Sequence, residues 1–335
     1  MNVRGAMSVG ARVVLLTVAL VVFTMISAFA FDVAGSVQRK PGADAEPAAA
    51  QAPPAGPDDR SVDSRQLKAA AGLLAASFLQ TLVFSLLVVR SCWSGWRLVL
   101  AVFVCFFGVT AVMSQIEAVV FRPQDVGGGV LPRLLGMSAM TTALFALAAV
   151  SLFGRWSRAP AGGTPVQPWA WPGRRWAGAL AASVIAYVIL YVTFGYYVVW
   201  QHAMAREFYG GDTAAPGSFA QMIATIITSR PRLIGLQCFR ALLWVAFALP
   251  VVRMMKGGRA ETALAVALLF GVVFPAQLLV PNPWMSAELR MLHLIETTGS
   301  NLVFGFVVGW LFAPRRGTES VTEGDVPVAG SARTA

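Results

Sequence analysis

Residues 289–313 read Leu-Arg-Met-Leu-His-Leu-Ile-Glu-Thr-Thr-Gly-Ser-Asn-Leu-Val-Phe-Gly-Phe-Val-Val-Gly-Trp-Leu-Phe-Ala. The stretch is long enough to cross a bilayer as one helix, and its polar residues are confined to the first turns. His293 and Glu296 stand three positions apart, so they share one helix face. Ionisable groups inside a membrane segment are costly and are functional candidates by default. We therefore expect a helix bundle organised around the polar end of this segment.

The composition places the chain among multi-pass membrane proteins. Hydrophobic residues make up 57% and charged residues 13%, against about 45–50% and about 25% in soluble domains. A net charge of +10 would suggest a nucleic-acid partner in a soluble protein, but here the basic residues lie mostly in short loops between apolar runs. We therefore expect membrane lipids around the chain and no nucleic-acid partner.

Eight apolar runs are long enough to span the hydrocarbon core, so the sequence predicts an all-α, polytopic transmembrane helix bundle. The runs lie near residues 12–31, 69–89, 98–121, 134–154, 176–200, 233–252, 262–280 and 291–313. If the N-terminus is cytoplasmic, the inner loops and termini hold 14 basic and four acidic residues, and the outer loops hold 11 and 10. The positive-inside rule then predicts that both termini are cytoplasmic, in the inner (plasma) membrane of a bacterium.

The chain divides into four parts at the sequence level. Residues 1–31 form either an uncleaved transmembrane helix or a signal peptide that ends at Ala28-Phe29-Ala30. Residues 32–67, rich in proline and alanine, predict a disordered extracytoplasmic linker. Residues 68–313 predict a seven-helix transmembrane bundle, and residues 314–335 a disordered cytoplasmic tail. Within the long outer loop 201–232, residues 219–228 predict a short amphipathic helix that either lies on the membrane surface or re-enters it.

With this topology, the polar groups of the spans fall at one depth, in the outer half of the membrane. The inner halves consist almost entirely of Leu, Val, Phe and Ala. We expect these polar groups to line a binding pocket that opens towards the outer face. The candidate residues are Glu117, Gln201, His202, Gln237, Arg240, His293, Glu296 and Asn301.

Arg240 is the strongest single signal in this set. Its guanidinium stays protonated, and a charge at depth costs a few kcal/mol on insertion scales. It therefore needs a carboxylate, and the spans offer Glu117 and Glu296. The acid that is left over is then protonated, hydrogen-bonded to His293 or paired with Arg122. The bland alternative is a structural ion pair that holds the third, sixth and eighth spans together.

Other kinds of site have weaker support. His293 and Glu296 have a spacing that two ligands of one metal ion can use, but the chain has only two histidines, so we predict no metal. His202 follows Trp200 at a span end, where it either joins the pocket or caps a helix. The three cysteines form no Cys-x-x-Cys pair and no Gly-rich phosphate loop is present, so we expect no cofactor.

Tyr196–Gln201, Gln237–Trp244 and Arg290–Asn301 resemble stretches of uncharacterised multi-pass membrane proteins of high-GC bacteria. The resemblance covers the last five spans and implies no activity. Our leading hypothesis is binding or transport of a small anionic solute or lipid headgroup, because an arginine in the pocket suits an anion. The alternatives are a membrane enzyme that uses Glu117 or Glu296 on a lipid-linked substrate, and a non-catalytic subunit of a membrane complex or homo-oligomer.

Overall fold

The computed structural model describes residues 7–33, 35, 59–123 (backbone alone for 59–63), 126–127, 129–157, 172–209, 214–282 and 285–314. Within these residues, eight helices are long and apolar enough to cross a membrane, as predicted. They are α1 (Val9–Ala30), α3 (Asp59–Val89), α4 (Gly95–Phe107) continued by η3 (Gly108–Val112) and α5 (Met113–Phe121), α6 (Val130–Leu152), α7 (Gly173–Phe194) continued by η5 (Gly195–Val199), α10 (Pro231–Met254), α11 (Arg259–Leu268) continued by η6 (Leu269–Val273) and η7 (Pro275–Leu279), and α12 (Ala287–Phe312). The chain is thus consistent with an integral membrane protein.

The helix α3 begins earlier than the sequence predicts. Its first residue is Asp59, so residues 59–67, which we assigned to the disordered linker, belong to a helix. Arginine, glutamine and leucine in this stretch are good helix formers, and proline and glycine are absent from it, which is compatible with a helix that extends beyond its apolar span. Residues 36–58 and 315–335 lie outside the described part of the chain, so the disorder predicted for them stays a prediction.

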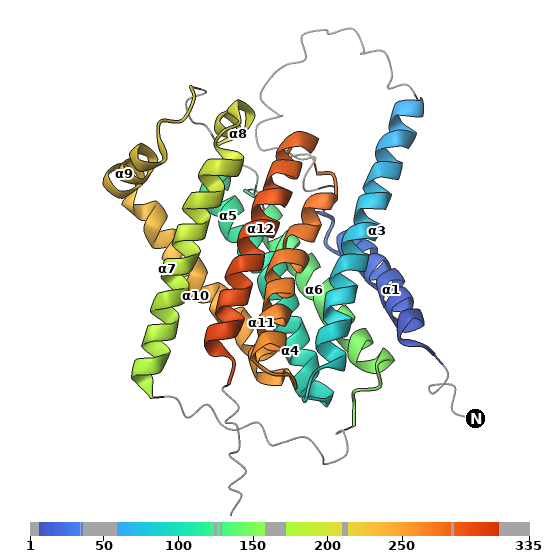
Figure 1. The fold of residues 1–335 in the computed structure, drawn as a ribbon. Helices are drawn as coiled ribbons and strands as arrows, with labels where there is room; N and C mark the ends of the chain where they lie inside the picture. The colour runs from blue at the N-terminus through green and yellow to red at the C-terminus, as the bar shows by residue number, and fades with distance from the viewer. Residues whose placement is uncertain are drawn as a thin grey trace, which may run out of the picture.

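Two short helices lie outside the spans, α8 (Ala203–Phe208) and α9 (Phe219–Ser229). The second is the predicted amphipathic helix. Ser218 and Gln221 close its N-terminus with reciprocal hydrogen bonds, the Ser218 hydroxyl accepting from the Gln221 amide and the Gln221 side chain accepting from the Ser218 amide. None of its residues is buried, and Figure 1 shows it at the edge of the bundle, beside the start of α10.

The described chain begins and ends on the same side of the bundle, which we call the terminal side; the opposite side is the far side (Figure 1). On the terminal side, the α3–α4 and α10–α11 connections are joined by backbone hydrogen bonds. Cys92 N–H donates to Met254 O (2.7 Å), and Lys256 N–H donates to Arg90 O (3.0 Å). Arg90 also pairs with Glu261 through two contacts of 2.6 Å. We call this set of contacts the clasp.

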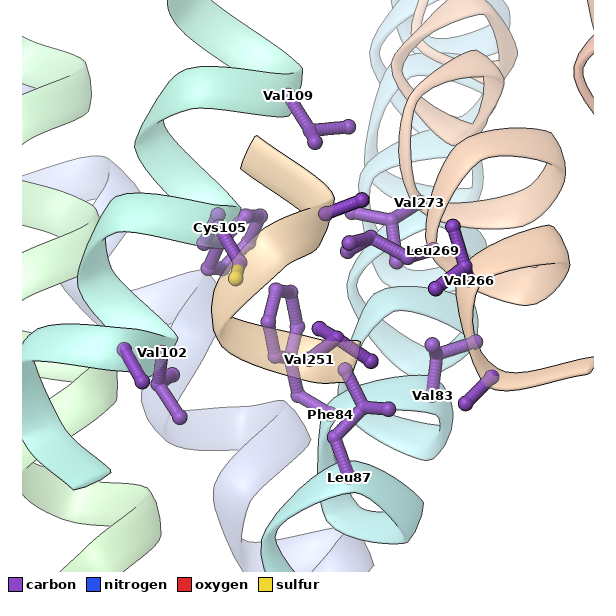
Figure 2. Packing of buried hydrophobic residues seen from close by; sticks show 14 of the residues in the cluster. Val83, Phe84, Leu87, Val102, Cys105, Val109, Val251, Val266, Leu269 and Val273 are labelled. Carbon is purple, nitrogen blue, oxygen red and sulfur yellow. The ribbon is translucent and has the colours of Figure 1, made fainter. Parts of the chain in front are cut away.

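The terminal half of the bundle is filled with apolar side chains. Figure 2 shows that α3, α4, α10, α11 and η6 all contribute to one packed cluster. In a membrane this packing is stabilised by van der Waals contact, because lipid tails are as apolar as the side chains. The labelled members are Val83, Phe84, Leu87, Val102, Cys105, Val109, Val251, Val266, Leu269 and Val273.

Small residues bring α11 and α12 into backbone contact. A Cβ added to Gly305 would lie 2.6 Å from Val266 O, and one added to Gly309 would lie 2.5 Å from the Cα of Ala263. Such close approach is the usual role of small residues at helix interfaces in membranes. It fixes α12, and with it His293 and Glu296, against the rest of the bundle.

Three of the spans contain a π-helical turn: η3, η5 and η6. Each π turn inserts one extra residue, so the helix beyond it is rotated relative to a continuous α-helix. In η3 the side chains help to satisfy the carbonyls, since Thr110 Oγ1 donates to Phe106 O (2.7 Å) and Ser114 Oγ donates to Thr110 O (2.6 Å). These turns set the direction in which the far-side polar residues point.

Candidate functional site

Arg240 is buried in the far-side half of α10. It lies nine positions after Pro231, which begins the helix at a position where its missing N–H costs nothing. The residue is 2% exposed. Its Nη2 contacts Glu117 Oε1 at 2.5 Å, and its Nη1 donates to Gln237 Oε1 at 3.2 Å. Of the two acids that the sequence offered, the structure therefore pairs Arg240 with Glu117.

Glu117 contacts Arg240 from α5, the helix that follows the η3 π turn. Its side chain is 42% exposed, whereas that of Arg240 is 3% exposed. The carboxylate therefore lies at the edge of the bundle and the guanidinium lies inside.

Two buried donor groups beside this pair have no hydrogen-bond partner among the described residues: Arg240 Nε and Gln237 Nε2. Arginine carries five N–H donors and glutamine two, while the contacts above engage two nitrogens of Arg240 and only the oxygen of Gln237. A buried donor without a partner costs about 1–3 kcal/mol. The cluster is therefore not a fully satisfied structural pair. The two donors belong to residues three positions apart on α10.

The second acid forms its own pair on α12. His293 Nδ1 lies 3.2 Å from Glu296 Oε2, and His293 Nε2 lies 3.0 Å from the hydroxyl of Tyr209. An ionised carboxylate can only accept, so Nδ1 carries the proton. In the neutral ring Nε2 then accepts from the Tyr209 O–H. One of the three predicted alternatives for the spare acid, hydrogen bonding to His293, is thus the one that the structure contains.

Tyr209 was missed by our sequence reasoning, because it lies in a loop outside the apolar runs. Its ring is held among aromatic neighbours: Phe208 at 5.0 Å, Trp200 at 5.8 Å and Phe121 at 6.1 Å between ring centroids. Burial raises the pKa of the Tyr209 phenol well above its ordinary value, and the carboxylates of Glu117 and Glu296 raise it further. The phenol therefore stays protonated and lies within electrostatic range of both acids.

Arginines hold the far-side end of this site together. Arg122, directly after α5, donates to Phe208 O (3.1 Å) and lies over the Phe208 ring at 4.3 Å. Arg206 of α8 donates to Trp200 O (2.6 Å). The segment that ends in Tyr209 is thereby fixed to both α5 and the end of η5.

The remaining predicted site residues form no hydrogen bond with the Arg240–Glu117 or His293–Glu296 pair among the contacts described for them. Gln201 is exposed, and its side-chain amide donates to Tyr196 O (2.8 Å). His202 is exposed and precedes α8 as its N-cap residue, but its side chain makes no capping hydrogen bond. Asn301 is buried, at 5% exposure, more than one turn deeper along α12 than Glu296. A pocket shared by all eight predicted residues is therefore not what the structure shows.

Within the described residues, no group of three or more His, Cys, Asp and Glu side chains is arranged to hold a metal ion. No protein-family model, curated protein or solved structure matches this chain.

Proposed function

We propose that this chain is a membrane protein that binds the oxyanion of a lipid headgroup or of a small solute at Arg240 and Gln237. The observation that carries the proposal is the pair of buried donors, Arg240 Nε and Gln237 Nε2, that no described residue satisfies. Each such donor costs free energy that an apolar residue would not. An oxyanion accepts hydrogen bonds from both groups, and hydrogen bonds between a guanidinium and an oxyanion are among the stronger ones in proteins.

The orientation follows from the charges that flank the spans. We place the terminal side in the cytoplasm of a bacterial cell, because the terminal-side loops and chain ends carry the excess of basic residues. Arg240 then lies in the outer half of the inner membrane. A ligand reaches it from the outer leaflet or from the extracytoplasmic solution.

Binding is favoured over transport by the asymmetry of the bundle. The apolar cluster of Figure 2 fills the terminal half with close-packed Val, Leu and Phe side chains. A transport pathway for an anion needs polar groups along its whole length. The exposed edge of Glu117 supports lateral approach of a ligand between α5 and α10.

The test uses the full chain in nanodiscs of a zwitterionic lipid. Phosphatidylglycerol is added to the lipid in one arm and sulfate to the solution in the other, and the thermal unfolding midpoint is measured. A ligand at 100 times its Kd stabilises by about 2.7 kcal/mol, which is about 4 °C for a chain of 335 residues. A shift with phosphatidylglycerol alone identifies a headgroup, and a shift with sulfate alone identifies a solute.

The variants separate binding from folding. Gln237→Leu keeps the Arg240–Glu117 contact intact, so it folds, and it should lose at least half of the ligand-induced shift. Arg240→Met should lose all of it. The matched control is Arg232→Met, which removes an exposed arginine from the same helix and should keep the full shift. No shift with either anion in the wild-type chain would refute the proposal.

A further inference from the structure

We infer that binding of an anion at Arg240 is coupled to uptake of one proton by His293; the inference rests on the function proposed above. The feature behind it is the chain of contacts that joins the two charged pairs. Tyr209 contacts His293 through its hydroxyl and lies within electrostatic range of Glu117, Glu296 and Arg240. The two pairs therefore share one polar region and cannot be treated as separate sites.

Aromatic rings lie between the two pairs. Glu117 and Phe121 are four positions apart, so they share one face of α5. The Phe121 ring meets the Tyr209 ring edge-on, and the Tyr209 ring meets the His293 ring edge-on at 5.8 Å. His293 in turn contacts Glu296. These contacts place Tyr209 between His293 and the face of α5 that carries Glu117.

The charge balance of the region gives the direction of the coupling. With His293 neutral, the charges of Arg240, Glu117 and Glu296 sum to −1. A bound phosphodiester, with one negative charge, changes this sum to −2, and a bound sulfate changes it to −3; both changes are unfavourable in a region of low dielectric constant. One proton on His293 makes the sum less negative by one in either case. Because the two binding free energies are linked, protonation of His293 strengthens anion binding by the same factor by which the bound anion strengthens protonation of His293.

The hydrogen bonds around His293 allow protonation without rearrangement. In the neutral ring, Nε2 accepts from the Tyr209 hydroxyl. In the imidazolium, Nε2 carries a proton and donates to the Tyr209 oxygen, which can accept as well as donate. The contact between Nδ1 and Glu296 then becomes a full ion pair. The proton comes from the extracytoplasmic solution, and no other bond has to break.

The surrounding elements offer few rival groups that could take the proton. The ionisable residues nearest in the fold are Tyr187 and Tyr191 on α7, Tyr196 and Tyr197 on η5, Glu117 on α5, Arg122 after it, Arg206 and Glu207 on α8, Arg240 on α10, and Glu288 and Arg290 on α12. Arginines and tyrosines keep their protons in the range of histidine titration. The α9, η6 and η7 segments carry no ionisable side chain. Histidine is the residue whose charge changes between about pH 5 and pH 8.

Calorimetry counts the proton directly. Sulfate or a soluble phosphatidylglycerol is titrated into the full chain in nanodiscs, in two buffers that differ in ionisation enthalpy. Both anions keep a constant charge in this range, so they add no protons of their own. We expect uptake of close to one proton per bound anion, and an observed Kd that weakens about tenfold per pH unit over the range in which His293 releases its proton.

Variants test the residue that takes up the proton. His293→Asn keeps a donor for Glu296 but cannot be charged, so it should bind with no proton uptake and with a Kd that does not change with pH. The matched control is His202→Asn, which removes the only other histidine of the chain and should leave the uptake unchanged. Tyr209→Phe should keep the uptake while changing the Kd at a given pH.

The outcomes separate the two proposals. Absence of binding by either anion at every pH would overturn the anion site itself. Binding without proton uptake in the wild-type chain, or undiminished uptake in His293→Asn, would overturn the coupling and leave the anion site standing.

Discussion

Replacing Glu117 by glutamine removes the carboxylate that contacts Arg240 while keeping the shape of the side chain. The guanidinium stays charged and buried, since its side chain is only 3% exposed. Breaking a buried pair from one side costs about 3–5 kcal/mol, whereas exposed pairs contribute about 0–1 kcal/mol. Because Glu117 is 42% exposed, we expect a loss between these ranges, about 2–3 kcal/mol.

The assay is thermal unfolding in detergent of Glu117→Gln, Arg240→Met and the double variant. The loss expected for Glu117→Gln lowers the midpoint by about 3–4 °C. Arg240→Met removes the buried charge itself and should cost less, about 1 kcal/mol. The double variant should be more stable than the sum of the single effects predicts, with a coupling energy of about 2 kcal/mol.

A matched control comes from the clasp. Arg90 and Glu261 also form an ion pair, but both side chains are partly exposed, at 47% and 31%. The same double cycle with Arg90→Met and Glu261→Gln should give a clearly smaller coupling. Additive effects at Arg240 and Glu117, or a larger coupling in the clasp, would show that Arg240 does not depend on Glu117 for its charge compensation.

Two further predictions concern packing and pH. Gly305→Leu forces α12 away from the α11 backbone, so it should lower the free energy of unfolding by about 1–3 kcal/mol. Gly235→Ala is the control, because no atom lies within 4 Å of the added Cβ, and its free energy of unfolding should stay within about 1 kcal/mol of wild type. Equal losses in the thermal midpoint of the two variants would contradict the close approach of α11 and α12. Tyr209 has a raised pKa in the folded chain, so its contribution to stability is present below about pH 10 and is lost as pH rises above it. The midpoint of the wild-type chain should therefore fall more steeply between about pH 9 and pH 11 than that of Tyr209→Phe, and parallel curves would exclude a buried phenol.

Much of the architecture could be predicted from hydrophobicity, because a bilayer imposes one simple rule on helix length. All eight spans correspond to apolar runs. The start of α3 could not be found in this way, since residues 59–67 extend the helix beyond its apolar part. The π turns were equally invisible, because one extra residue in a helix leaves the hydropathy of the run unchanged.

The site was predicted in part. Sequence reasoning identified Arg240 and both candidate acids, but depth along a helix does not define which helices are neighbours. The partner of Arg240 therefore stayed open until the structure placed α5 beside α10. Gln201 and His202 are exposed, and the Gln201 amide donates to Tyr196 O instead of joining either pair. The signal that could have drawn attention to Tyr209 is the aromatic density of residues 196–209, of which sequence analysis assigned 196–200 to the fifth span and 201–209 to a loop.

The clasp also has a consequence for how the protein is made. Arg90 and Glu261 are 171 positions apart, and ribosomes add about 5–20 residues per second. After α3 leaves the ribosome, roughly ten to thirty seconds pass before its partner exists. During that interval Gln80 of α3 also lacks its partner, because in the completed fold its amide donates to Val273 O (3.2 Å). We therefore expect the insertion machinery to shield the first half of this chain in the membrane until the second half has been synthesised and inserted.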